Sequence, residues 1–194
     1  MIAVFIMLIL FCGGIIKKKS RTLTYLMLVY MWIFYALNTY SGDYISYKYV
    51  YTLIEQGKIW GHFEPGFTLL MWVCIKIGLP FLGFKSILAT IYILGLFKTI
   101  KTYTKNTAFA LAIFMIFPFM YFASVLRAGI AGLIIVYAIQ FLKRDVKHGD
   151  LKYIGYILSA TMVHTSSLFF LLFLLIRKGA KKGIMIRVMG VALM

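Results

Sequence analysis

The sequence predicts an all-α protein, a polytopic bundle of transmembrane helices. Of the 194 residues 63% are apolar and only 13% are charged, and the mean hydropathy is +0.94, whereas a typical soluble domain is about 45–50% apolar. The apolar residues are gathered in runs of membrane-helix length, and the cations lie in short clusters between the runs. We therefore expect one integral membrane domain covering residues 1–194.

The apolar runs, taken in order, predict about seven complete membrane segments and a partial one. They cover residues 1–16, 22–37, 66–97, 107–122, 127–142, 153–176 and 184–194. The long run 66–97 should be two helices, because Gly78-Leu79-Pro80 interrupts it. The last run ends after about half a membrane crossing. The sequence therefore predicts a chain that is incomplete at its C-terminus.

The distribution of charge predicts which loops face the cytoplasm. The net charge is +16, and four clusters, residues 17–21, 98–105, 143–152 and 177–187, hold 16 of the 21 Lys and Arg residues. Three of the five acids lie in the loop 38–65. Cations between apolar runs are typical of cytoplasmic loops, so this charge argues against a nucleic-acid partner. We expect the four clusters inside and the loop 38–65 outside.

Strict alternation of crossings conflicts with this charge pattern. Two crossings within residues 66–97 would leave the basic cluster 98–105 outside the cell. One arrangement that satisfies the charge rule lets the segment after Glu64-Pro65-Gly66 enter the membrane and return near residues 78–80. It also breaks the run 153–176 near His164 into two half-helices. Such breaks are tolerated where they line a polar cavity or are buried in protein.

The loop 38–65 concentrates polar and aromatic residues. If the chain is helical from Asp43 onward, Tyr44, Tyr47 and Tyr51 share one face, and Ser41-Gly42 stands at the N-cap. One interpretation is a sugar-binding surface, in which Tyr44 and Tyr47 contact sugar rings and Asp43 contacts hydroxyls. The other is an interfacial helix whose aromatic side chains anchor it at the membrane surface.

Two ionisable residues stand out within the apolar segments. Arg127 is the only cation between Lys105 and Lys143 and is expected near the external surface. There a guanidinium can bind phosphate in a bidentate manner, or simply extend to the interface as a flanking residue. His164 lies at the centre of the run 153–176. It is a candidate general base or phosphate ligand, or a structural hydrogen-bonding group between helices.

Four motifs in this order resemble the EpsG family of Wzy-like polysaccharide polymerases. They are Gly42-Asp43 followed by Tyr47, Glu64-Pro65-Gly66-Phe67, Arg127-x-Gly129-Ile130-Ala131, and His164-x-Ser166-x-Leu168. The resemblance extends from about residue 38 to residue 176. It implies a multi-pass protein of the bacterial plasma membrane that joins oligosaccharide repeat units carried on undecaprenyl pyrophosphate into exopolysaccharide or capsule. Membrane lipid and other polysaccharide-export proteins are the further partners it implies.

This glycosyl transfer would assign roles to the residues singled out above. Arg127 would hold the pyrophosphate and stabilise the charge that develops on it. Glu64, Asp43 and His164 are alternative bases for the acceptor hydroxyl, and the sequence does not decide among them. No cluster of carboxylates suits a divalent metal, so we expect a metal-independent reaction without a cofactor. Tyr44 and Tyr47 are the candidate sugar contacts.

Three other functions fit parts of the sequence. A transporter or flippase of the same lipid-linked oligosaccharide would use Arg127 to hold the phosphate without breaking a bond, although the two halves show no convincing internal repeat. A membrane-bound acyltransferase acting on polysaccharide would use His164, although the usual acidic partner is absent from the adjacent sequence. A purely structural subunit is the third alternative.

Overall fold

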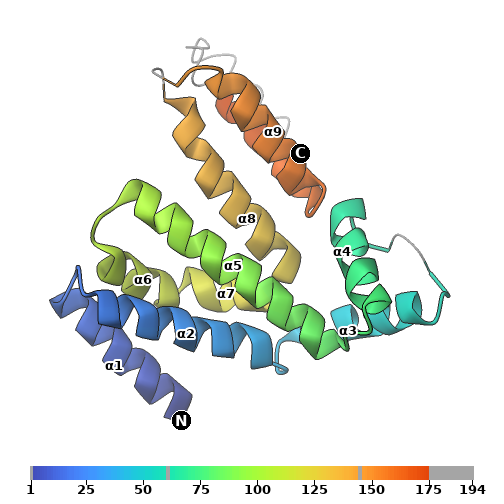
Figure 1. The fold of residues 1–194 in the computed structure, drawn as a ribbon, viewed down its shortest axis with the longest axis horizontal. Coiled ribbons are helices and arrows are strands. Elements are labelled where there is room, and N and C mark those ends of the chain that lie inside the picture. Colours follow the sequence, from blue (N-terminus) through green and yellow to red (C-terminus); the bar gives the residue numbers. More distant parts are fainter. Residues whose placement is uncertain (1, 60–61, 144–145, 175–194) are drawn as a thin grey trace.

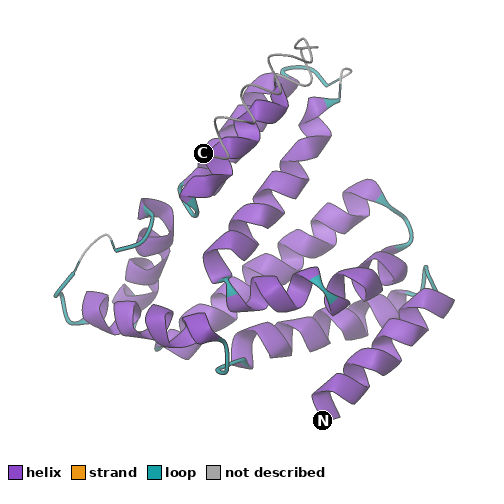
Figure 2. Cartoon of the chain, turned by 180° about the vertical axis from the view of Figure 1, so that it is seen from behind, coloured by secondary structure: helices purple, strands orange, loops and turns teal. Residues whose placement is uncertain are grey.

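The computed structural model describes residues 2–59, 62–143 and 146–174, and within these ranges every regular element is helical (Figures 1 and 2). The predicted all-α class is thus confirmed. The predicted basic cluster 177–187 and the partial segment 184–194 lie outside the described residues. The elements are α1 (Ile2–Ile16), α2 (Arg21–Leu37), α3 (Gly42–Glu55), α4 (Pro65–Lys76), α5 (Phe81–Tyr103), α6 (Thr107–Ile116), α7 (Pro118–Ser124), α8 (Leu126–Ala138), the 3-10 helix η1 (Ile139–Leu142), α9 (Gly149–Thr161) and the 3-10 helix η2 (Thr165–Leu172).

Local chemistry explains where several helices begin and end. Ser20 caps α2, because its Oγ accepts a hydrogen bond from the backbone N–H of Leu23 at 3.3 Å. Pro65 occupies the first turn of α4, where its missing N–H costs nothing. Beyond α4, Gly78 has a φ of +74°, which only glycine adopts freely. The chain then turns at Pro80 into α5, so the predicted break at residues 78–80 is confirmed.

Helix lengths support fewer membrane crossings than the sequence predicts. Among the described helices, α5 alone is both long enough, at 23 residues, and apolar enough to cross a membrane by itself. The pair α6 and α7 is bent by 59° at Phe117-Pro118 and passes the same test if it counts as one broken span. The helices α1, α2 and α4, and α8 with η1, are apolar but shorter. The expectation of about seven complete spans therefore stays a prediction.

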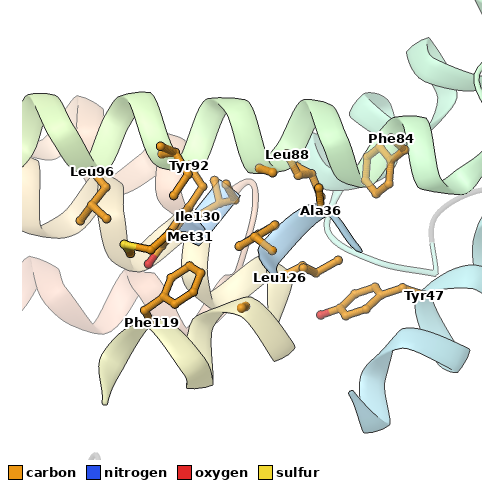
Figure 3. Close-up of a cluster of buried hydrophobic side chains, with 14 of the residues drawn as sticks. Met31, Ala36, Tyr47, Phe84, Leu88, Tyr92, Leu96, Phe119, Leu126 and Ile130 are labelled. Atoms are coloured by element: carbon orange, nitrogen blue, oxygen red, sulfur yellow. The ribbon is translucent and has the colours of Figure 1, made fainter. Parts of the chain in front are cut away.

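The hydrophobic core lies where α2, α5, α7 and α8 meet. Helix α2 packs along α5, and α1 packs on α6. Figure 3 shows side chains from several helices converging on this core. The rings of Tyr35 and Tyr92 stack across α2 and α5 with centroids 5.2 Å apart. Fully buried members include Met27, Met31, Phe84, Leu88, Tyr92, Leu111, Met115 and Phe119.

The opposite faces of these helices carry apolar side chains that the protein leaves uncovered. Large hydrophobic residues are exposed along α1, α2 and α5, among them Ile9, Val29 and Leu94. So many exposed large apolar side chains on neighbouring helices are typical of a protein that faces lipid.

Helices α3 and α4 form an angled pair beside the bundle, and α4 begins next to the end of α9 (Figure 1). The run 153–176 breaks as predicted: α9 ends at Thr161 and η2 begins at Thr165. The two helices pack side by side, and the hydroxyl of Tyr153 in α9 donates a hydrogen bond to the carbonyl oxygen of Phe170 in η2 at 2.7 Å. His164 therefore lies in the turn of a helical hairpin, and this turn meets α4.

Candidate functional site

Glu64 organises a polar site from three distant segments of the chain. It precedes α4 at the N-cap position, and its side chain is largely buried. One carboxylate oxygen, Oε2, accepts a charge-assisted hydrogen bond from Nη1 of Arg127. The other, Oε1, accepts from the backbone N–H of Thr165 at 3.0 Å and from its hydroxyl at 3.3 Å. A single carboxylate thus joins the starts of α4, α8 and η2.

Arg127 is held on several sides. A cation in the first turn of a helix opposes the helix dipole, so its place at the start of α8 requires a compensating charge, which Glu64 supplies. The guanidinium carbon lies 4.5 Å from the centre of the Phe63 ring and 5.9 Å from that of Tyr47. Its Nε donates to the Tyr47 hydroxyl at 3.4 Å. Among the described residues, Nη2 has no hydrogen-bond partner, and about a quarter of the side chain is exposed.

Tyr47 connects the site to the core. Its ring is buried against Phe63 and Phe67, with centroid distances of 5.2 and 5.7 Å. Figure 3 shows the side chain reaching from α3 toward Leu126, the residue before Arg127. Packing therefore fixes the ring, and the hydroxyl at its end orients the guanidinium.

His164 lies beside the same carboxylate. Its Nδ1 is 3.5 Å from Oε1 of Glu64, beyond the length of a good hydrogen bond, and this buried nitrogen has no closer partner. Roughly a third of the side chain is exposed. A shift of a few tenths of an ångström would bring the imidazole and the carboxylate into hydrogen-bonding distance, which is common when a ligand closes such a site.

Gly66 makes the close approach of α4 to the hairpin turn possible. Its N–H donates to the carbonyl oxygen of Met162 at 2.8 Å. A Cβ on residue 66 would lie 2.7 Å from that oxygen, closer than real Cβ contacts occur. The glycine of the Glu64-Pro65-Gly66 motif therefore lets the backbone of α4 dock directly on the end of α9, which sets the distance between Glu64 and His164.

The environment of Glu64 stabilises its charged form. Partial burial by itself would raise the pKa of this carboxyl. The hydrogen bonds from the Thr165 backbone and from Arg127, together with the charge of Arg127, outweigh that effect and lower the pKa to about 2. At neutral pH the carboxylate is ionised and already occupied by donors, which makes it an orienting group and a weak proton acceptor.

The structure brings some of the predicted site residues together and leaves others apart. Arg127, Glu64, His164 and Tyr47 form one cluster. Asp43 and Tyr44 are on α3, as the predicted helix requires, but neither contacts that cluster in the described residues. Asp43 is exposed, and the Tyr44 ring packs on Phe81 with centroids 5.3 Å apart.

Two residues of the cluster escaped the sequence analysis. Phe63 stacks on Arg127, and Thr165 donates twice to Glu64. Both are sequence neighbours of residues that were singled out, yet their residue types are common in membrane segments. Nothing in the sequence separates them from ordinary apolar and capping residues.

An apolar cavity of about 680 Å³ adjoins the hairpin turn. Its walls come mainly from α5, α8 and η2, and His164, Ser166 and Ser167 line it where η2 begins. The Ser167 hydroxyl is buried and has no hydrogen-bond partner in the structure. His164 therefore belongs both to the polar cluster and to the wall of an apolar chamber. The described residues contain no group of three His, Cys, Asp or Glu side chains that could hold a metal ion.

These features define an all-helical membrane protein with a guanidinium, a carboxylate and an imidazole gathered at the meeting point of three helices. The model of the EpsG family matches residues 21–194, most of the chain, and the protein belongs to this family. The match covers every residue of the cluster, and it confirms the family that the four motifs suggested. Comparisons with curated proteins and with solved structures found no match.

Proposed function

We propose that this protein polymerises oligosaccharide repeat units carried on undecaprenyl pyrophosphate, at the outer face of the bacterial plasma membrane, into exopolysaccharide or capsule. Membership of the EpsG family supports a membrane protein of polysaccharide synthesis. The observation that carries the finer proposal is the cluster of Arg127, Glu64 and His164. It offers a cation for the leaving group and an imidazole for the acceptor, beside an apolar cavity suited to a lipid chain.

In this proposal Arg127 binds the pyrophosphate. Glu64, Phe63 and Tyr47 hold the guanidinium in one orientation, while Nη2 remains available to an incoming anion. As the bond between the anomeric carbon and the pyrophosphate oxygen breaks, the electron pair leaves with the pyrophosphate. A preorganised guanidinium stabilises that developing charge more than mobile water would.

His164 is the proposed base. The acceptor hydroxyl oxygen forms the new bond to the anomeric carbon, and its proton passes to Nε2 of the imidazole. The Glu64 carboxylate, 3.5 Å from Nδ1, then stabilises the imidazolium that forms. Of the three candidate bases, Glu64 is engaged by three donors and Asp43 lies apart from the cluster, so His164 fits the role best. Tyr44 and Asp43 remain proposed contacts to the sugars.

The apolar cavity is the proposed site for the isoprenoid part of the substrate. Its lining includes His164 and Ala128, the residue after Arg127, so a lipid chain in it would leave its pyrophosphate near Arg127. Burial of a prenyl chain there would be driven by the hydrophobic effect, because most of the lining side chains are apolar.

Deletion of the gene tests the function in the cell. We expect single repeat units on undecaprenyl pyrophosphate to accumulate at the outer face, as measured by mass spectrometry of lipid extracts after external enzymatic labelling. Units trapped on the cytoplasmic side would instead identify a flippase. An unchanged pool of lipid-linked oligosaccharides would contradict both.

Complementation of the deletion tests the base. The variant His164→Gln should insert into the membrane at the wild-type level but should not restore polymer. The matched control is His148→Gln, because His148 is exposed immediately before α9, at the opposite end of that helix from His164. Polymer of normal length in the His164→Gln strain would remove His164 from the mechanism.

A further inference from the structure

A second pocket, lined by cations, lies at the C-terminal end of α5 and shares the lining residue Thr104 with the apolar cavity. It has a volume of about 380 Å³, and its walls are the turn between α1 and α2, the end of α5, and the loop that leads into α6. Lys19, Arg21, Lys101 and Lys105 line it, together with three threonines and two aromatic residues. The lining includes no aspartate or glutamate. Four positive charges thus face one cavity without a carboxylate among them.

Hydrogen bonds fix the floor of this pocket. The Thr24 hydroxyl donates to the Ser20 carbonyl at 2.8 Å and lies 3.0 Å from the Thr107 hydroxyl, which therefore donates to it. The N–H of Phe109 donates to the Lys18 carbonyl at 3.2 Å and ties α6 to the turn between α1 and α2. The two loops are joined by these bonds, so the cations project from a rigid frame.

The backbone adds to the positive potential. Arg21 and Thr107, both in the lining, are the first residues of α2 and α6, so two helices direct the positive ends of their dipoles at the pocket. Asn106 precedes α6 without a capping hydrogen bond from its side chain. The Thr104 hydroxyl accepts from the N–H of Asn106 at 3.0 Å, which leaves its proton available as a donor.

The pocket adjoins surface that suits lipid. Tyr25 and Phe97 form part of its wall, with ring centroids 6.0 Å apart, and the Tyr25 side chain is exposed. Exposed Leu26 and Val29 continue along α2 from this point. An anion held here would therefore have polar contacts at one side and an apolar helix surface at the other.

We propose that this pocket binds a phosphate group, and that the phosphate is the headgroup of an anionic phospholipid of the cytoplasmic leaflet. Cations that converge without carboxylates attract phosphate, and helix N-termini add donors for its oxygens. Basic pockets between membrane helices on the cytoplasmic side bind anionic headgroups in this way. The pocket shares no residue with the cluster around Arg127 and one lining residue, Thr104, with the apolar cavity, and the inference uses none of the roles assigned in the proposed function.

Binding of defined lipids to the purified full chain tests the inference. Native mass spectrometry in detergent micelles would titrate phosphatidylglycerol, with phosphatidylcholine as the zwitterionic comparison and inorganic phosphate as the free anion. The variants Arg21→Gln and Lys105→Gln should each weaken phosphatidylglycerol binding about fivefold, as expected for one juxtamembrane charge. Arg21→Lys should restore most of it.

The matched control is Lys17→Gln, which removes the same charge from the same turn but from a residue outside the lining. It should change the affinity less than about twofold, since it alters only the general surface potential. Inorganic phosphate that binds with the same variant dependence would support the site and identify a free anion as its ligand. Equal losses in Lys17→Gln and Arg21→Gln, or equal affinity for phosphatidylcholine, would overturn the proposal.

Discussion

Toward the beginning of α5 a single guanidinium, Arg127, is held by a carboxylate and two aromatic rings, whereas at its end four cations line a pocket with no carboxylate. In the first region the cation is fixed and its charge is largely balanced. In the second the charges are uncompensated within the protein. The difference indicates that Arg127 is positioned for one geometry, while the basic pocket attracts anions by its potential.

The strongest test of this difference exchanges arginine for lysine in both regions. Arg127→Lys should reduce polymer at least about 100-fold, because an ammonium cannot bond to Glu64, stack on Phe63 and keep a free donor pair at once. The same exchange at Arg21 should leave the polymer unchanged, since the basic pocket requires a positive charge and not the planar guanidinium of arginine. Polymer yield and immunoblots of membrane fractions provide the measurement. Equal effects of the two exchanges would contradict the distinction.

Accessibility to a membrane-impermeant thiol reagent tests the sidedness of the two regions. In a background without Cys12 and Cys74, Tyr40→Cys should be labelled in intact cells, because Tyr40 is 98% exposed in the loop expected outside. Lys17→Cys, exposed in the turn beside the basic pocket, should be labelled at least about tenfold less until the cells are opened. The reverse pattern would overturn the topology.

A methyl group at Gly66 tests the docking of α4 on the hairpin turn. Gly66→Ala should destabilise the protein by about 1–3 kcal/mol, because its Cβ would meet the backbone of Met162. Gly155→Ala is the matched control. Gly155 lies within α9, and a Cβ there would meet nothing within 4 Å, so alanine should stabilise the protein by up to ~1 kcal/mol. Thermal unfolding in detergent measures both. A Gly66→Ala protein as stable as wild type would show that the close approach is not required.

The smallest effect concerns pH. Because the pKa of Glu64 is lowered from 4.5 to about 2, its bonds to Arg127 and Thr165 contribute fully above about pH 5 and are lost as the pH falls toward 2. The difference in unfolding midpoint between wild type and Glu64→Gln should therefore be constant from about pH 7 to 5 and shrink below that. A difference that already shrinks near pH 6 would contradict the lowered pKa.

Much of the helical layout could be predicted from the sequence. The expected segments 1–16 and 22–37 coincide closely with α1 and α2, and the breaks at Gly78 and near His164 both occur. Local rules suffice there, because apolar runs, glycine and proline act on their own neighbourhood. The number of crossings stays a prediction, since among the described helices α5 alone reaches membrane length by itself.

The sequence by itself determined which ionisable side chains the site has. Arg127, Glu64 and His164 are rare ionisable residues in an apolar chain, and placing such groups among apolar helices is costly, so their presence indicates a role. Only the tertiary structure decided that they form one cluster, that Tyr47 joins it, and that Asp43 does not. Arg127 and Glu64 are 63 residues apart, and no local pattern encodes such a pairing. It arises when helix packing brings the ends of α4, α8 and α9 to one point, which is a property of the whole fold.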